Sequence, residues 1–141
     1  MDERLLARIA PDEVPFWRTL GIEVIAAEEG LARLRLPARP ELETRRAGTL
    51  HGGVLASLID AAGSAALLTT RAEDDTTWAG FASTDLNVSY LAAAQSDVIA
   101  EARVLRAGRT VVYTTVEVTD AAGVVVGVGR VTYLIVRRRE G

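Results

Sequence analysis

The stretch TLHGGVLASLIDAAGSAALL, residues 49–68, holds two ionisable side chains, His51 and Asp60, among small and apolar residues. A carboxylate buried in such surroundings is costly unless something compensates its charge. Gly52 and Gly53 follow the histidine. Backbone N–H groups at the start of a helix favour a developing negative oxygen, and glycine lets a ligand approach them closely. These residues predict an oxyanion-binding helix start and a carboxylate base on the same helix.

Residues 52–70 predict one long helix, because they lack proline and are rich in alanine and leucine. A solvated helix face usually carries long charged side chains, but the face around Asp60 carries none, so we expect Asp60 to face a cleft rather than solvent. Gly63 in mid-helix costs roughly 1 kcal/mol relative to alanine, which predicts close approach by another chain or a ligand. The residues within about 60° of Asp60 on a helical wheel are Gly53, Ala56, Ser57, Gly63, Ser64 and Leu67, and the far side carries Leu55, Leu58, Ala62 and Ala65.

The spacing of Gly52 and Asp60 adds a constraint. Eight residues of helix rise by about 12 Å. Groups that serve one reacting carbon must lie about 3 Å from it, so one subunit cannot bring both groups to one carbonyl. If both are catalytic, a second copy of the helix must lie antiparallel to the first, as a two-fold dimer provides.

The composition excludes several kinds of chemistry. All 16 basic residues are arginine, which rules out a Schiff-base or P-loop lysine. Cysteine is absent and there is one histidine, so thiol chemistry, disulfides and a multi-histidine metal site are not expected. A net charge of −3 argues against a nucleic-acid partner. The N-terminus does not resemble a signal peptide and no long run is free of charge, so we expect a cytoplasmic protein that does not span a membrane.

The remaining pattern predicts an α+β fold, an antiparallel sheet covered on one face by the long helix. Residues 1–20 form a helical arm interrupted at Pro11 and Pro15, and residues 22–37 form two strands that turn at Glu29 and Gly30. Residues 38–48 are a polar loop, and residues 71–80 are an exposed linker. Four strands follow, at 81–91, 98–106, 110–119 and 124–136, with turns at 107–109 and 120–123. Alternation in the first of these places Ala82, Leu86, Val88 and Tyr90 on one face and Ser83, Asp85, Asn87 and Ser89 on the other.

Three segments together resemble the PaaI-like acyl-CoA thioesterases of the hotdog superfamily: GTLHGGVLASLIDAAGSAAL, STDLNVSYLAAA and GRTVVYTTVEVTDAAGVVVGVGRVTYLI. The resemblance runs from about residue 20 to 136. It implies a curved antiparallel sheet wrapped around one long helix, and a homodimer that pairs into a tetramer. The implied organisation is a helical arm at 1–20, one hotdog domain at 21–137 and a tail at 138–141.

The resemblance also assigns roles to single residues. Gly52 polarises the thioester carbonyl with His51 beside it, and Asp60 of the partner subunit is the base that activates water, or the nucleophile. Ser83 falls where relatives place a hydroxyl that positions the water, unless it only satisfies the sheet edge. The positions that contact substrate are Gly53, Arg45, Arg46, Gly108 and Arg109.

The chain departs from the family pattern at one of these arginines. Many relatives carry an asparagine six residues before the histidine, where this chain has Arg45; Arg45 or Arg46 replaces it, or Gly52 acts alone. Arg109 lies in a turn where relatives bind coenzyme A phosphates. For all three arginines, ordinary solvated charge is the alternative.

The sequence thus predicts hydrolysis of an acyl-CoA or aryl-CoA thioester without metal or cofactor. A hotdog dehydratase or hydratase is one alternative, although those enzymes pair a catalytic histidine with an acid and His51 belongs here to the glycine motif. An acyl-CoA-binding hotdog protein without catalysis is the other. The acyl group is left open.

Overall fold

The fold is known from a computed structural model, which describes residues 1–139; residues 140 and 141 of the predicted tail lie outside that range. Two helices and a short 3₁₀ turn form the N-terminal arm, a single long helix α3 follows a hairpin, and four strands complete the chain. The bounds are α1 (Glu3–Ile9), η1 (Pro11–Glu13), α2 (Pro15–Leu20), β1 (Glu23–Glu28), β2 (Leu31–Leu36), η2 (Pro40–Leu42), α3 (Gly52–Thr69), β3 (Trp78–Tyr90), β4 (Val98–Ala107), β5 (Val111–Asp120) and β6 (Val125–Arg137).

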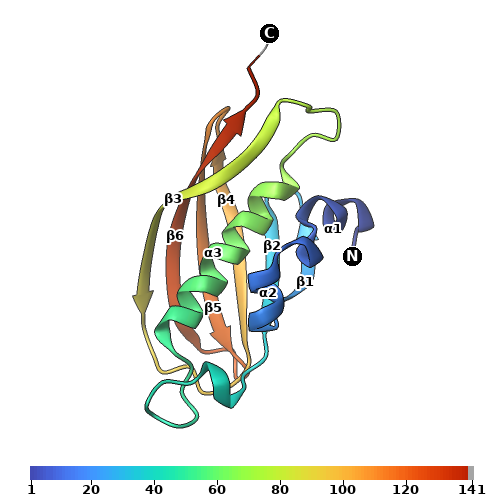
Figure 1. The fold of residues 1–141 in the computed structure, drawn as a ribbon. Coiled ribbons are helices and arrows are strands. Elements are labelled where there is room, and N and C mark those ends of the chain that lie inside the picture. The colour runs from blue at the N-terminus through green and yellow to red at the C-terminus, as the bar shows by residue number, and fades with distance from the viewer. Residues whose placement is uncertain (140–141) are drawn as a thin grey trace.

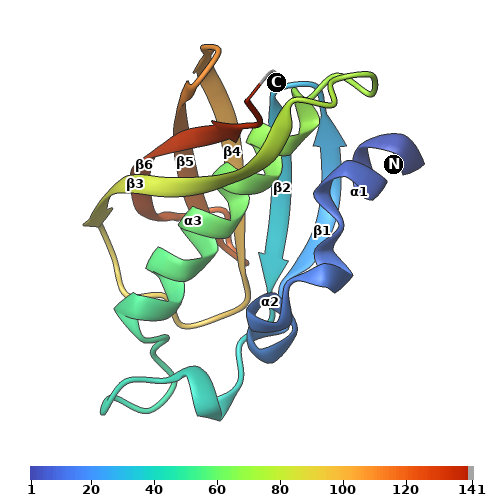
Figure 2. The same cartoon turned by 45° about the horizontal axis from the view of Figure 1, so that its top comes forward.

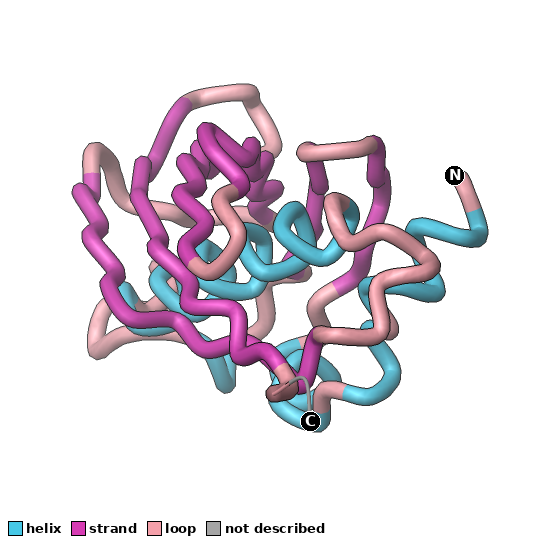
Figure 3. Tube along the Cα trace, turned by 90° about the horizontal axis from the view of Figure 1, so that it is seen from above, coloured by secondary structure: helices cyan, strands magenta, loops and turns pink. Residues whose placement is uncertain are grey.

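The six strands form one antiparallel sheet in the order β1-β2-β4-β5-β6-β3. Figure 1 shows α3 lying across the inner face of this sheet, and the view from above shows the strands curving around it (Figure 3). The predicted α+β arrangement, with one helix covering an antiparallel sheet, is confirmed. β3 and β1 are the two edge strands, so one long edge of β3 has no partner within the described chain.

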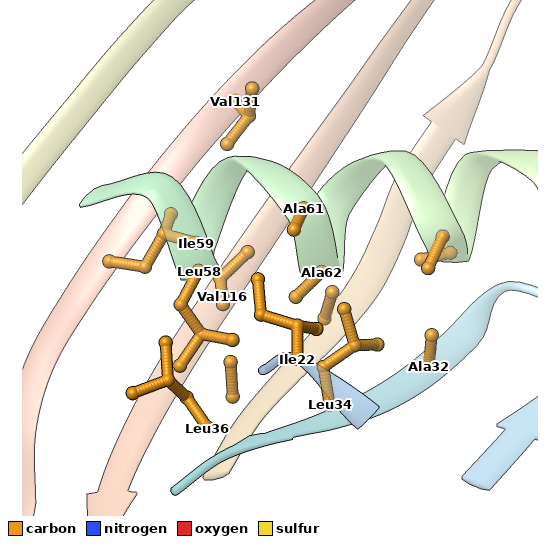
Figure 4. Close-up of a cluster of buried hydrophobic side chains, with 14 of the residues drawn as sticks. Ile22, Ala32, Leu34, Leu36, Leu58, Ile59, Ala61, Ala62, Val116 and Val131 are labelled. Carbon is orange, nitrogen blue, oxygen red and sulfur yellow. The ribbon is translucent and has the colours of Figure 1, made fainter. Parts of the chain in front are cut away.

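The core lies between α3 and the sheet. Leu58, Ile59 and Ala62 of the helix belong to the same buried cluster as Leu34 and Leu36 of β2, as Figure 4 shows. Close packing of helix and sheet depends on a glycine in β6: a Cβ on Gly129 would lie 2.8 Å from Cγ2 of Ile59. By length and composition α3 could cross a membrane, but most of it is buried inside the protein, as befits a core helix.

The N-terminal arm is helical as expected and breaks at the predicted prolines. η1 and α2 each begin at a proline, where the missing N–H is tolerated, and Gly21 closes α2 in the left-handed region at φ 79°. α1 and α2 lie beside β1 (Figure 2), and Ile9, Trp17 and Leu20 are buried in the common core. The arm is therefore part of the hydrophobic core.

The prediction of an exposed linker over residues 71–80 is wrong for the last three residues, which belong to a strand. Trp78 is only 7% exposed and begins β3. Its ring lies under two guanidinium groups, with the Arg71 carbon 5.6 Å and the Arg137 carbon 5.9 Å from the ring centroid. Asp75 and Thr77 bind Arg137, which ties this segment to the end of β6. Tertiary contacts thus order a segment whose composition alone is that of a loop.

The predicted alternation of β3 is also wrong, at Ser83. The pairing with β6 shifts between Ser83 and Asp85, which leaves Thr84 as an extra residue. Ser83 pairs with the buried Tyr133, whereas Asp85 pairs with Thr132 on the opposite face. The bulge therefore turns Ser83 toward α3, whereas regular alternation predicts that it shares a face with Asp85, Asn87 and Ser89.

Candidate active site

A cavity of 630 Å³ opens between α3, the N-terminal arm and the β3–β6 edge of the sheet. Its polar wall carries Asp60, Ser83 and Tyr133, together with Ser57 and Ser64 of α3. Its apolar wall is formed by Ile9, Val14, Phe16, Trp17, Leu68 and Phe81. Asp60 therefore lines a cavity that combines hydroxyl groups with an apolar wall, as small-molecule sites commonly do.

A larger cavity of 990 Å³ lies on the outer face of the sheet, among Asp85, Tyr113 and Arg130. That face is open to solvent and faces away from α3. The smaller cavity holds a half-buried carboxylate whose pKa is displaced. We therefore place the candidate site at Asp60, because carboxylates with perturbed pKa values in a cleft are concentrated at functional sites.

Asp60 is half-buried, and this burial raises the pKa of its carboxyl group. Hydrogen bonds from Tyr133 and Ser83 act in the opposite direction and favour the charged form. Within residues 1–139 no arginine forms an ion pair with it. A carboxylate held by hydroxyls alone is more basic than one paired with a cation, which suits it to take a proton.

Tyr133 is the site residue that the sequence analysis missed. Its side chain is 1% exposed, and its hydroxyl donates to the backbone oxygen of Asp60 at 2.6 Å and lies 3.2 Å from Oδ1 of the same residue. A buried tyrosine needs a partner for its hydroxyl. The sequence pattern that could have identified it is the alternation in VTYLIV, which places Tyr133 on the same inward face of the strand as Val131 and Ile135.

The start of α3 is organised by His51. The imidazole is the N-cap: Nδ1 accepts from Gly53 N–H at 2.8 Å, and the His51 carbonyl accepts from Val54 N–H at 2.9 Å. No acceptor for Gly52 N–H is recorded among residues 1–139. Among the first amides of the helix, the N–H of Gly52 is therefore available to donate to an oxygen of a ligand.

Tyr90 is a second residue that the sequence did not identify as part of this region. Its hydroxyl donates to the Gly52 carbonyl at 2.7 Å. A Cβ on Gly52 would lie 3.2 Å from the tyrosine ring, so the glycine also makes room for this contact. The exposed end of β3 thereby fixes the first turn of α3.

The structure groups the predicted residues into three places. Asp60 and Ser83 share the cavity, whereas His51, Gly52 and Gly53 stand together at the start of α3, next to the exposed Arg45 and Arg46. Gly108 and Arg109 lie in the β4–β5 turn at the other end of the molecule (Figure 1), where the Arg109 carbonyl accepts from Arg137 at 2.8 Å.

Within one chain, Gly52 and Asp60 lie on the same continuous helix, about 12 Å apart along its axis. One chain therefore does not bring them to one reacting carbon. Among residues 1–139 there is no cluster of three or more histidine or acidic side chains that could hold a metal ion.

Gly63, in the middle of the helix, faces side chains of this same chain. The prediction that another chain or a ligand approaches the helix closely at Gly63 is therefore wrong. A Cβ there would lie 2.4 Å from the Tyr133 hydroxyl and 2.9 Å from Thr114 Oγ1. The glycine therefore leaves space for strand residues that reach the helix.

A curved antiparallel sheet wraps around one long helix that carries a carboxylate, and comparison with known proteins identifies the family that has this fold. The family model described as the thioesterase superfamily matches residues 47–127. The chain belongs to this superfamily, and the predicted hotdog fold is confirmed.

Individual relatives agree with this assignment. Human acyl-coenzyme A thioesterase 13 is 35% identical over 121 residues, 83% of this chain and 82% of that protein. A Halobacterium salinarum protein provisionally named an esterase is 40% identical over 126 residues, 84% of this chain and 82% of its own length. A solved structure of a protein from the thioesterase superfamily superposes with a TM-score of 0.81 at 31% identity, covering 94% of this chain and 98% of that one. These relationships support thioesterase activity.

Proposed function

We propose that this protein is a cytoplasmic acyl-CoA thioesterase of the PaaI-like kind, which hydrolyses its substrate to a free acid and coenzyme A without a metal or redox cofactor. The observation that carries the proposal is Asp60, a half-buried carboxylate with a raised pKa that faces an apolar-walled cavity beside the Ser83 and Tyr133 hydroxyls. The name of the human relative, acyl-coenzyme A thioesterase 13, supports coenzyme A as the thiol part of the substrate.

The proposed reaction uses groups of two subunits. Gly52 N–H of the partner subunit donates to the thioester oxygen, and the positive end of its helix favours the oxyanion that forms. Asp60 takes a proton from water while Ser83 holds that water, and the hydroxide attacks the carbonyl carbon. The tetrahedral intermediate then collapses, the C–S bond breaks, and the protonated Asp60 returns its proton to the coenzyme A thiolate. The products are the acid and the free thiol.

His51 and Gly53 have a supporting part in this scheme. Gly53 N–H donates to Nδ1 of His51. Because Nδ1 is an acceptor, the neutral imidazole carries its proton on Nε2. The engaged Gly53 amide is the reason that the scheme assigns the thioester oxygen to Gly52. Arg45 or Arg46, both exposed just before the helix, replaces the family asparagine near that oxygen, or Gly52 acts alone.

Two features support a dimer as the catalytic unit. The first is the separation of Gly52 and Asp60 along one helix, which a single thioester cannot bridge. The second is β3, a strand of 13 residues whose outer edge has no partner among residues 1–139. Apolar side chains are exposed on it at Leu86 and Tyr90, and at Leu91 just after its end. A long unpaired edge readily accepts a strand of another chain. Pairing of β3 with its copy would set the two helices antiparallel.

We further propose that two dimers pair through the outer face of the sheet. Leu105, Leu134 and Val136 are exposed there, and exposed apolar side chains that cluster on one face favour contact with another protein surface. Sedimentation of the purified protein gives the number of subunits.

The two ends of the substrate are assigned to different regions. The acyl group occupies the cavity next to Asp60, whose apolar wall includes Val14, Phe16 and Trp17 of the arm. The coenzyme A phosphates contact Arg109 in the turn that begins at Gly108, because an exposed guanidinium suits phosphate. A panel of aryl, short-chain and long-chain acyl-CoAs, with release of the thiol as the signal, identifies the preferred acyl group. Binding of acyl-CoA without release of thiol would favour a non-catalytic binding protein.

Isotope labelling separates the two possible roles of Asp60. In a single turnover in ¹⁸O-water, a general base sends the label directly into the product acid. An aspartate nucleophile instead forms an anhydride, and water attack on its aspartyl carbonyl leaves the label in Asp60. Mass spectrometry of the product and of the peptide that contains Asp60 distinguishes these outcomes.

A hybrid dimer tests the shared site. Gly52→Pro removes the N–H, and the preceding His51 already has ψ 137°, which a following proline requires. We expect Gly52→Pro to lower kcat by about 10² to 10³-fold. In a hybrid of Gly52→Pro with Asp60→Asn, isolated through two affinity tags, one site carries both changes and the other carries neither. The hybrid should recover up to half of the wild-type activity per dimer.

Gly52→Ala is the matched control, because it adds the same Cβ beside the exposed Tyr90 but keeps the N–H. It should retain most of its activity. A hybrid as inactive as its two folded parents would show that the groups act within one chain, or that one of them is not catalytic.

A further inference from the structure

Tyr133 reaches from β6 into the middle of α3 and ends at the backbone and side chain of Asp60. Its hydroxyl donates to the Asp60 carbonyl at 2.6 Å and stands 3.2 Å from Oδ1 of the carboxylate. Burial raises the pKa of this phenol well above its ordinary value, and the Asp60 carboxylate adds to the effect. Tyr133 therefore keeps its proton and remains a donor around neutral pH.

Gly63 creates the space that this hydroxyl occupies. A Cβ at position 63 would lie 2.4 Å from the Tyr133 hydroxyl and 2.9 Å from Thr114 Oγ1, closer than real Cβ atoms approach. Thr114 is itself fixed, because it is 1% exposed and its hydroxyl donates to the Val131 carbonyl at 2.9 Å. The phenol thus has little room to move away from Asp60.

The ring of Tyr133 is held as firmly as its hydroxyl. It packs edge-on against Phe81 of β3, with ring centroids 6.0 Å apart and an angle of 74° between the planes. Phe81 and Ser83 both line the cavity that contains Asp60. Strands β3 and β6 therefore position the phenol from two sides, and the helix leaves a gap for it.

We propose that Tyr133 is a positioning residue for the Asp60 carboxylate, and that Gly63 is the glycine that lets it act. The single O–H is shared between the Asp60 carbonyl and Oδ1, which holds that carboxylate oxygen in place and leaves Oδ2 to take the proton from water. This inference rests on the proposed function, in which Asp60 is the base or nucleophile. A core tyrosine that only satisfied its own hydroxyl would need the Asp60 carbonyl alone and would not have to lie beside the carboxylate.

The acidic limb of the pH profile of kcat/KM reports the pKa of Asp60, and the groups around Asp60 determine that pKa. The titratable and charged groups on the same cavity are Arg8 and Glu13 of the arm, Arg71 after α3, and Tyr133. Tyr133 and Ser83 are the groups that lower the pKa of Asp60 against the effect of burial. Loss of the phenol hydroxyl should therefore raise this pKa.

Tyr133→Phe removes the hydroxyl and keeps the ring. We expect kcat to fall about tenfold, the effect of losing one hydrogen bond to a charged group, with KM nearly unchanged. The acidic limb of kcat/KM should move to higher pH. Tyr113→Phe is the control, because Tyr113 is exposed on the outer face of the sheet, and both measurements should match the wild type.

A double-mutant cycle tests the part of Gly63. Gly63→Ala should displace the hydroxyl and lower kcat about as much as Tyr133→Phe does. Added to Tyr133→Phe, the same change should cost little further kcat, because the hydroxyl is already absent. Fully additive losses would show that Gly63 serves only the packing of α3.

Several outcomes would overturn the proposal. The proposal is wrong if Tyr133→Phe folds and keeps both the wild-type kcat and the wild-type acidic limb. It is also wrong if the only effect of Tyr133→Phe is a change in thermal stability. If Tyr133→Phe does not fold, fluorotyrosine is introduced at position 133 instead. The hydroxyl of fluorotyrosine is a stronger donor, so it should move the acidic limb of kcat/KM to lower pH. An acidic limb that does not move contradicts the proposal. Asp60→Asn is measured alongside. If it keeps its turnover, the proposed function itself is wrong, whereas an inactive Asp60→Asn beside an unaffected Tyr133→Phe removes only the positioning role.

Discussion

Two aspartates near α3 have opposite environments. Asp75, six residues after the end of α3, accepts from the Thr77 hydroxyl at 2.6 Å and from the Thr77 N–H at 2.9 Å, and pairs with Arg137 at 3.1 Å. These contacts hold the pKa of the Asp75 carboxyl well below its usual range. Asp60, in the middle of the helix, has hydroxyl donors and no arginine partner among residues 1–139, and burial raises its pKa.

The comparison separates a carboxylate that stabilises the fold from one that is available for chemistry. Asp75 connects the chain after α3 to the end of β6, and its charge is matched by donors on every side. Asp60 retains a burial cost that its donors only partly offset, which the fold tolerates at a functional site. Exchange of each carboxylate for its isosteric amide tests this distinction.

Asp60→Asn should have the largest effect. We expect kcat to fall by at least about 10²-fold, because the amide cannot accept the proton of water. Asp75→Asn should keep kcat within about twofold, because it touches neither the cavity nor the start of α3. Steady-state rates with the best acyl-CoA of the panel check both variants. Near-normal turnover of Asp60→Asn would remove it from the mechanism and abolish the contrast.

The Asp75 region should influence KM instead. Arg137, the partner of Asp75, donates to the carbonyl of Arg109 and so steadies the turn assigned to coenzyme A. Arg109→Ala should raise KM about fivefold, the upper end for an exposed ion pair, and should do so equally for every acyl chain. Asp75→Asn should shift KM in the same direction and by less. An effect that varies with acyl chain length would place Arg109 at the wrong end of the substrate.

Stability should respond in opposite directions. The raised native pKa of Asp60 means that the unfolded chain ionises first as pH rises, so the native state loses stability up to neutral pH. Asp60→Asn should therefore unfold a few degrees higher than the wild type at neutral pH. This difference should disappear below the ordinary carboxyl pKa of about 3.9, where both states are protonated.

For Asp75 the sign is reversed. Its lowered native pKa stabilises the fold at neutral pH, and this contribution is lost as pH falls from about 3.9 through the native value. Asp75→Asn should unfold a few degrees lower at neutral pH, with the difference shrinking in acid. Thermal melts of the three proteins across this range provide the measurement. Equal melting of the two variants at neutral pH would contradict the comparison.

Much of the fold followed from local pattern. The Glu29–Gly30 turn predicted the β1–β2 hairpin, and the proline-free alanine-rich run predicted α3 from Gly52 onward. Regular alternation with Gly-containing turns predicted β4, β5 and β6. These signals are reliable because helix capping, turn geometry and side-chain period depend on neighbours in the chain.

Residues 71–80 and the face of Ser83 did not follow from local pattern. The polar residues around Trp78 predict a linker, whereas the folded chain places its ring in the hydrophobic core, with Arg71 and Arg137 lying over it. Thr84 forms a bulge that depends on the register of β3 against β6, and register is a property of two strands together.

At the candidate site, the sequence by itself determined the types of the groups: a lone carboxylate on the helix, a histidine and two glycines at its start, and the roughly 12 Å between them. The tertiary structure decided what surrounds that carboxylate. The Tyr133 hydroxyl comes from a strand 73 positions away and fits only because Gly63 has no side chain. Such a contact is invisible in the sequence, because hydrogen bonding and steric fit between distant segments exist only once the sheet has wrapped around the helix.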